Sequence, residues 1–204
     1  MYDENSPILG PVQGEPALAA RQIVRRPTGE YTEHDVANVI VPAYFAVCAP
    51  VGVDPLLALA QMVHETGNLT SYWAARPRRN PAGIGVTGQT QPDRPINIAA
   101  WAFDAGSNMW RFGVSFATWE HHGIPAHIGR LLAYAVAPGQ ETPAQAALIA
   151  QALSVRSFPA RMRGSAPILK QLGRAHNPTG QGWASPGTDY GARIATIANR
   201  LAGL

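Results

Sequence analysis

Cysteine and long apolar runs are nearly absent from this chain. The single cysteine, Cys48, excludes an internal disulfide and a multi-cysteine zinc site. It lies between Val47 and Ala49, which predicts a buried small hydrophobe and not a nucleophile. No apolar run approaches the roughly 20 residues that a membrane-spanning helix needs. Residues 1–5 show neither a positive leader nor an apolar stretch, so no secretory signal is expected.

Charge is also scarce, because only 14% of the residues are charged. The 16 Lys and Arg exceed the 13 Asp and Glu, which gives a net charge of +3 and a mild preference for anionic partners. The arginines occur singly or in short clusters without a basic helix, so we expect a solvated surface, no nucleic-acid partner and no membrane insertion. With 46% hydrophobic residues the chain reads as a soluble globular protein.

The pattern of apolar residues predicts a mainly α (α+β) architecture. Residues 1–30 mix Pro, Gly and charge without a period, which predicts an extended N-terminal arm or linker that an assembly partner could order. Residues 31–204 are expected to form one domain. Helical spacing is found from Thr32, where a capping residue stands, from Asp54, and in the segments 124–136, 143–153, 166–172 and 190–201. Residues 80–120, with strand-like patterns at 83–88 and 109–119, predict a small β-hairpin lobe beside a groove.

Glu65 is the residue with the clearest chemical signal. It stands in the last turn of the helix that opens at Asp54-Pro55 and stops at Gly67. There the helix dipole disfavours a carboxylate by roughly 0.3 to 1 kcal/mol, and partial burial adds to this effect. Both raise the pKa, as a general acid requires. The plain alternative is a solvated glutamate at a helix end, but the glycine-rich segment from Asn80 predicts one wall of a groove nearby.

Several motifs resemble those of the glucosaminidase family of peptidoglycan hydrolases. The first is Ala60-Gln61-Met62-Val63-His64-Glu65-Thr66-Gly67, followed by Ser71 and by Asn80-Pro81-Ala82-Gly83-Ile84. The family pattern is Glu-Ser-Gly, a Ser four residues later, and then Asn-Leu-Phe-Gly-Ile. Weaker similarity is found in Phe116 to Glu120, leading into the helix with His127, and in Asp189-Tyr190-Gly191 to Leu201. The resemblance covers roughly residues 35 to 204.

This resemblance implies a lysozyme-like fold in which Glu65 is the general acid of an endo-β-N-acetylglucosaminidase. The glycan strand of peptidoglycan would be cut after N-acetylglucosamine. In this chain Thr66 replaces the usual Ser, and Ala82 stands where an aromatic residue is common. The positions that the resemblance places on the substrate side are Ser71, Asn80, Gly83, Ile84, Trp119 and Tyr190.

A second carboxylate is less well marked in the sequence. Glycosidases usually employ two, and the candidates are Asp93, Asp104 and Glu120, each of which also suits a turn or cap. We select Glu120 as the second catalytic residue if one exists. Substrates with an N-acetyl group can instead supply their own nucleophile.

Other functions remain open at this stage. His64-Glu65 resembles part of a zinc-protease motif, but Asn68 stands where the second histidine is required, and His121, His122 and His127 are expected on a surface or helix face. No metal and no cofactor are therefore expected. The alternatives are a muramidase or lytic transglycosylase of the same fold, or a non-catalytic wall-binding or structural component of a phage tail or injection apparatus. An enzyme of this kind acts on the cell wall and, without a leader, would be an endolysin delivered by a phage or another machine.

Overall fold

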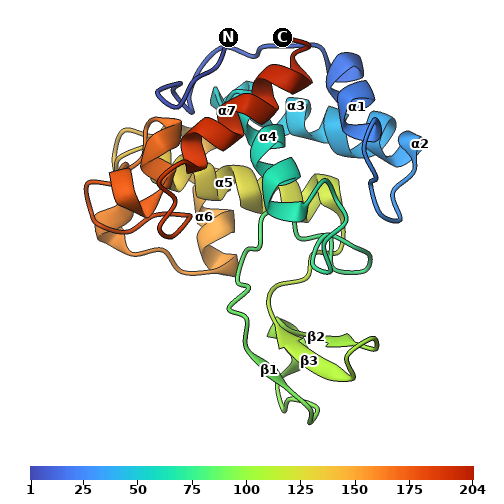
Figure 1. Cartoon of the computed structure of the whole chain (residues 1–204). Coiled ribbons are helices and arrows are strands. Elements are labelled where there is room, and N and C mark those ends of the chain that lie inside the picture. The colour runs from blue at the N-terminus through green and yellow to red at the C-terminus, as the bar shows by residue number, and fades with distance from the viewer.

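The computed structural model describes residues 1–204 as a group of helices with a small sheet on one side (Figure 1). Helix α4 lies in the middle of the helical part, and α3, α5 and α7 surround it. The sheet projects away from the helices at the end of two long connections. The predicted architecture of a mainly helical domain with a small β lobe is confirmed. The main elements are α1 Pro16–Val24, α2 Glu33–Asp35, α3 Val41–Cys48, α4 Pro55–Thr66, β1 Thr90–Gln91, β2 Trp101–Asp104, β3 Met109–Phe112, α5 Ile124–Ala135, α6 Pro143–Val155 and α7 Tyr190–Leu201.

Helix α4 begins and ends where the sequence predicts. Asp54 caps its first turn by accepting the Leu56 amide at 2.9 Å, and Pro55 takes the first position. Gly67 ends it with a φ of 57°, a left-handed conformation that glycine adopts without strain. These signals fix the position of the last turn, and therefore of Glu65.

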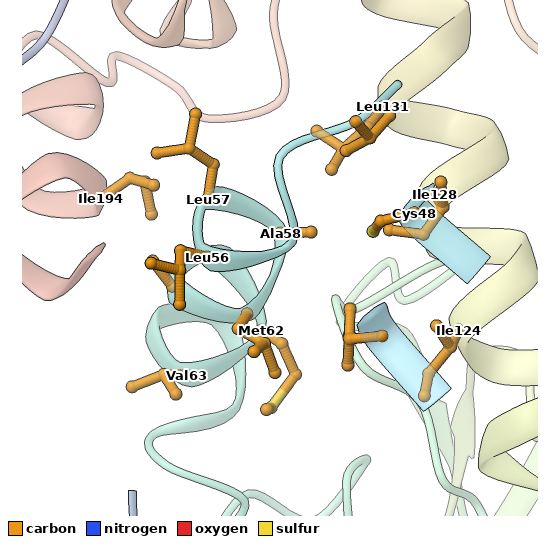
Figure 2. Close-up of a cluster of buried hydrophobic side chains, with 14 of the residues drawn as sticks. Cys48, Leu56, Leu57, Ala58, Met62, Val63, Ile124, Ile128, Leu131 and Ile194 are labelled. Atoms are coloured by element: carbon orange, nitrogen blue, oxygen red, sulfur yellow. The ribbon is translucent and has the colours of Figure 1, made fainter. Parts of the chain in front are cut away.

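The core forms around α4 as one cluster of 39 buried hydrophobic residues. In Figure 2, Leu56 and Leu57 lie on the side of α4 that faces Ile194 of α7. Ala58 points the other way, toward Cys48 and the side chains of α5. Because α4 is covered on nearly every side, a polar group on it is either hydrogen-bonded or held at the edge of the core.

A continuous helical segment, Glu33–Val51, precedes α4 and contains a π-helical turn at Val36–Ile40. This segment of 19 residues is long and apolar enough to cross a membrane by length and composition alone. No segment of that kind was predicted from the sequence. The segment supplies Ile40, Tyr44 and Cys48 to the core, each fully buried. It therefore serves as a core helix of this fold, and Cys48 is the buried small hydrophobe that was predicted.

The N-terminal 30 residues differ from the predicted extended arm. They contain α1, in which Ala19, Ala20 and Ile23 are buried against the core. Ile8 is buried as well, and its amide donates to the Pro167 carbonyl at 2.9 Å. Small and apolar residues in α1 give it a face to bury, so this part packs on the helical domain and is not a free arm.

The later helices largely follow the predicted spacing. The helices expected at 124–136, 143–153 and 190–201 are confirmed as α5, α6 and α7. In the segment 166–172, only a short 3-10 helix at Leu169–Leu172 forms. Pro167 has no amide hydrogen to donate, and the neighbouring amides of Leu169 and Lys170 bond to Ser6 and Glu4 instead.

The sheet is antiparallel, with the strand order β1-β3-β2. Trp101 pairs with Phe112 and Asp104 with Met109 in the β2–β3 hairpin. The strand predicted at 83–88 is absent, because Gly83, Gly85 and Gly88 all have positive φ and form a loop. This loop connects the helical part to the sheet and forms a wall beside α5.

Candidate active site

Glu65 lies in the last turn of α4, where the first residue of α7 meets it. The Tyr190 hydroxyl donates to Glu65 Oε1 at 2.6 Å. Tyr190 is itself 4% exposed, whereas Glu65 is only half-buried. The carboxyl group is therefore held from inside the protein through Oε1.

The surroundings of Glu65 favour its protonated form. Burial raises the pKa of this carboxyl above its usual value of 4.5, while hydrogen bonding from Tyr190 and the Trp183 indole opposes the shift. The ion pairs of the structure all involve other acids, so no cation neutralises Glu65 directly. A half-buried carboxyl without a cation is the arrangement expected of a general acid.

Behind Tyr190 a row of buried polar side chains extends into the core. Gln61 Nε2 donates to the Tyr190 hydroxyl at 2.8 Å. Gln61 Oε1 lies 2.9 Å from His127 Nε2, and His127 Nδ1 lies 2.9 Å from the Tyr44 hydroxyl. We call these four residues, Tyr44, His127, Gln61 and Tyr190, the polar row. It joins α3, α5, α4 and α7 and ends on Glu65.

The direction of these hydrogen bonds follows from the chemistry of His127. Burial lowers the pKa of this imidazole to about 3, so it is neutral and has one donor and one acceptor nitrogen. Gln61 Oε1 only accepts, which places the imidazole proton on Nε2 and leaves Nδ1 to accept from Tyr44. Every hydrogen bond in the polar row therefore points toward Glu65.

The predicted position of His127 needs correction. It was expected on a surface or helix face, and it does lie on a helix, α5, but on the buried face, where it is 0% exposed. A buried imidazole must find partners for both nitrogens, and Gln61 and Tyr44 supply them. His121 and His122, in contrast, are exposed as predicted.

Asn80 holds the loop that follows it in shape. It is fully buried, and its Nδ2 donates to the Ile84 carbonyl at 2.8 Å and to the Val114 carbonyl at 2.9 Å. Its Oδ1 accepts from the amides of Ala82 and Ile84. These bonds use the amide inside the protein, so a contribution of Asn80 to binding would come through the shape of the loop.

Gly83 and Ile84 line a cavity of about 210 Å³ that we call the hairpin-side cavity. Its other walls include Trp183 and Arg130. Gly83 has a φ of 61°, and a Cβ at this position would meet open space, so the backbone conformation is what requires glycine. Ile84 is 3% exposed and packs beneath the loop with its neighbours in a small second core. Glu65 is not among the residues that line this cavity, but Trp183, one of its walls, is a side chain that lowers the pKa of Glu65.

Ser71 and Trp119 have evident structural roles. Ser71 Oγ accepts the Ala74 amide at 3.2 Å in the turn after α4. Trp119 is 3% exposed, and its indole donates to the Tyr31 hydroxyl at 3.1 Å. The largely covered face of this indole leaves little of it for a sugar ring to stack on.

The candidate second carboxylates are not brought to Glu65. Glu120 lies in the π-helical turn Trp119–Gly123 and lines pockets beside Val39 on the N-terminal side of the fold. Asp104 is held in the β hairpin by Arg111 at 2.6 Å. Asp93 is exposed near β1. No hydrogen bond or ion pair links Glu120 to Glu65 or to the polar row, and its catalytic role stays a prediction.

The sequence did not predict the roles of two residues of the site. Gln61 lies in the first motif but was given no role, and His127 was expected on a surface or helix face. Gln61 stands four residues before Glu65, which puts both on one face of α4. A glutamine in the middle of an otherwise apolar helix indicates that the folded protein supplies a hydrogen-bond partner for it. His127 carried the same signal in α5. The pairing with Tyr44 depends on tertiary packing and has no counterpart in local sequence.

The structure holds no group of three or more His, Cys, Asp and Glu side chains arranged to bind a metal ion.

No protein-family model and no curated protein matches the chain. Among solved structures it is similar to S. aureus autolysin E in complex with the muropeptide NAM-L-Ala-D-iGlu, with 15% identity, a TM-score of 0.47, and coverage of 98% of this chain and 72% of that chain. A catalytic glutamate-to-alanine mutant of autolysin E with the disaccharide NAG-NAM gives the same values. Autolysin E alone matches 97% of this chain and 70% of its own length, also with 15% identity and a TM-score of 0.47.

Proposed function

We propose that this protein is a peptidoglycan hydrolase of the endo-β-N-acetylglucosaminidase type, with Glu65 as its general acid. The single observation that supports this most is the state of Glu65. It is a half-buried carboxyl without a cation, at the end of α4, with one oxygen held by Tyr190 and a raised pKa. The place of action would be the bacterial cell wall, with delivery by a phage or another machine as part of the proposal.

The polar row supports this role by fixing where the acid proton resides. Because Gln61 donates to the Tyr190 oxygen, the Tyr190 proton is directed to Glu65 Oε1. When Glu65 is protonated, its own proton is then placed on Oε2, the oxygen that the polar row leaves free. A proton on the outward oxygen is in position for transfer to a ligand.

In the proposed reaction Glu65 transfers this proton to the glycosidic oxygen as the bond from that oxygen to the anomeric carbon breaks. The attacking group is either water or the acetamido oxygen of the N-acetylglucosamine itself, which avoids the need for a second carboxylate. Glu120 remains the candidate base of the first route. In the first route Glu120 takes the proton of the attacking water, gives it up to solvent, and Glu65 is reprotonated from solvent. In the second route water then opens the intermediate formed by the acetamido oxygen, and its proton returns to Glu65.

The hairpin-side cavity is the proposed sugar-binding region. Two observations support this: Trp183, one of its walls, lowers the pKa of Glu65, and another wall is the loop held by Asn80. In this proposal Gly83 and Ile84 present the loop backbone to the glycan strand, and Trp183 offers an aromatic face.

The test is incubation of the purified protein with peptidoglycan, followed by mass spectrometry of the new ends. Reducing N-acetylglucosamine supports the proposal. Reducing N-acetylmuramic acid would indicate a muramidase, anhydro ends a lytic transglycosylase, and no release a binding or structural module.

Glu65→Gln is the matched variant for this experiment. The amide keeps the size of the side chain and still accepts from Tyr190, but it has no acidic proton to transfer. We expect normal folding and a loss of cleavage of about 10²- to 10⁴-fold. A folded Glu65→Gln protein with wild-type cleavage would remove Glu65 from the mechanism.

A further inference from the structure

A second, larger cavity adjoins the hairpin-side cavity. Its volume is about 620 Å³, and it shares Arg130, Tyr134, Arg156 and Gly182 with the hairpin-side cavity. Arg174 completes its charged lining. We call this cavity the arginine groove. Its size falls in the range of roughly 300 to 1,000 Å³ that is typical of ligand sites.

The charge of the arginine groove is not balanced by the protein. No Asp or Glu lines either cavity. Arg130, Arg156 and Arg174 take part in no ion pair, whereas the ion pairs of the structure use other arginines, namely Arg76, Arg111, Arg163 and Arg193. The cavity is large enough to hold an Asp or Glu side chain, yet no such side chain lines it. The unpaired guanidinium groups therefore favour an anionic ligand.

Arg130 is held in place at the junction of the two cavities. Its Nη1 donates to the Arg156 carbonyl at 3.1 Å, and its guanidinium lies 5.2 Å from the Phe158 ring centre. Burial lowers the pKa of Arg130, Tyr134 opposes the shift, and the charge of Arg156 adds to it. Two like charges at one junction cost stability, and a bound oxyanion would offset that cost.

The position of the groove identifies the anion. With the sugar in the hairpin-side cavity, as proposed above, a ligand that extends from there into the arginine groove is a substituent of the glycan strand. In peptidoglycan, the acidic stem peptide branches from the same glycan strand that is cut, and its isoglutamate and terminal residue carry carboxylates. Guanidinium groups bind carboxylates through paired hydrogen bonds.

We propose that the arginine groove binds carboxylates of the peptidoglycan stem peptide and makes the protein selective for glycan strands that carry stems. The proposal rests on the proposed peptidoglycan substrate. Arg156 and Arg174 are the specificity-determining side chains, since both are exposed and reach the groove from opposite segments. Arg130 sets the junction between the sugar and peptide regions.

The first test compares hydrolysis of stem-bearing glycan strands with that of strands from which an amidase has removed the stems. In the double variant Arg156→Gln/Arg174→Gln we expect the ratio of kcat/KM for the two substrates to fall about tenfold, because two charge-assisted contacts are lost. Arg161→Gln is the matched control, an exposed arginine on the neighbouring 3-10 helix that does not line the groove, and its ratio should equal that of the wild type. An unchanged ratio in a folded double variant overturns the proposal.

The second test measures binding without catalysis. The full chain carrying Glu65→Gln is titrated with NAM-L-Ala-D-iGlu and with the same muropeptide after amidation of its carboxylates. We expect tighter binding of the acid form, and loss of that preference when Arg174→Gln is added. Equal binding of the two forms, or equally tight binding of inorganic phosphate, would overturn the assignment to the stem peptide. Selective binding without any cleavage would instead retain this inference and remove the proposed hydrolysis.

Discussion

Glu65 and Asp104 are two carboxylates in different regions of the molecule, and the protein treats them in opposite ways. Asp104 lies in the β hairpin, where hydrogen bonds from Ser107 and Arg111 hold its pKa below the usual 3.8. Glu65 lies at the edge of the helical core, where burial holds its pKa above 4.5. The Asp104 carboxylate stays charged and stabilises the hairpin turn. The Glu65 carboxyl keeps its proton to a higher pH, which is what general acid chemistry requires.

The two carboxylates also differ in the side chains that contact them. A cation accompanies Asp104, whereas neutral donors accompany Glu65. Tyr190 and the rest of the polar row orient Glu65 without removing the preference for the protonated form that burial creates. Substitutions that alter these partners distinguish the two regions, because their expected effects on cleavage differ in size.

Tyr190→Phe should have the largest effect among the partners. It removes the hydroxyl that holds Oε1 at 2.6 Å and leaves Gln61 Nε2 without its acceptor. We expect cleavage to fall by about 10²-fold, as a misplaced catalytic group implies. The pKa of Glu65 should rise further, since a hydrogen bond that lowers it is lost. Initial rates measured against pH would check both, and unchanged rates would refute the role of the hydroxyl.

Gln61→Met should have a smaller effect of about tenfold on kcat. Methionine fills a similar volume but cannot donate to Tyr190, so the tyrosine proton is free to turn away from Glu65. The protonated acid then gains an alternative hydrogen bond to Tyr190, so its pKa should rise further. Tyr31→Phe is the control, because it removes a buried hydroxyl that bonds to the Ala74 carbonyl and not to the polar row. If both variants behave alike, the polar row has only a structural role.

The pH dependence of stability should differ between wild type and Glu65→Gln. The pKa of Glu65 is raised in the folded state, so the folded protein binds more protons than the unfolded chain from about 4.5 upward. Wild-type stability therefore falls, relative to Glu65→Gln, as the pH rises through the folded pKa. Thermal unfolding at a series of pH values measures this difference. A wild-type stability that stays level or rises relative to Glu65→Gln over this pH range would contradict the raised pKa.

Asp104→Asn should have the smallest effect on cleavage, within about twofold. It weakens the ion pair with Arg111 and the turn at Gly106, both in the exposed hairpin. The pKa of Asp104 is lowered, so its contribution to stability is present above pH 3.8 and is lost as the pH falls through the folded pKa. Cleavage assays at neutral pH would check the twofold limit. A large loss of activity would give Asp104 a part in the reaction.

Sequence reasoning located Glu65 because its signals are local. The cap at Asp54, Pro55 and the stop at Gly67 fix one helix and the place of the acid on it. Helices α5, α6 and α7 followed from apolar spacing in the same way. The glycine loop at 83–88 was misjudged as a strand, since its alternating pattern gave no sign of the left-handed backbone at each glycine.

The polar row could not be assembled from sequence in the same manner. Its members come from four helices, and the contact of Tyr44 with His127 joins residues 83 positions apart. Only Gln61 and Glu65 share a local spacing. The integration of residues 1–30 was missed for a related reason, because Ile8 and Ile23 become buried against distant parts of the chain.

The most direct test of the central claim is a titration of the Glu65 carboxyl carbon by ¹³C NMR, with Glu65→Gln used to assign the signal and Asp104 followed as an internal reference. We predict that Glu65 titrates above 4.5 and Asp104 below 3.8. A Glu65 carboxyl that titrates at or below 4.5 would contradict the account of a proton held for transfer.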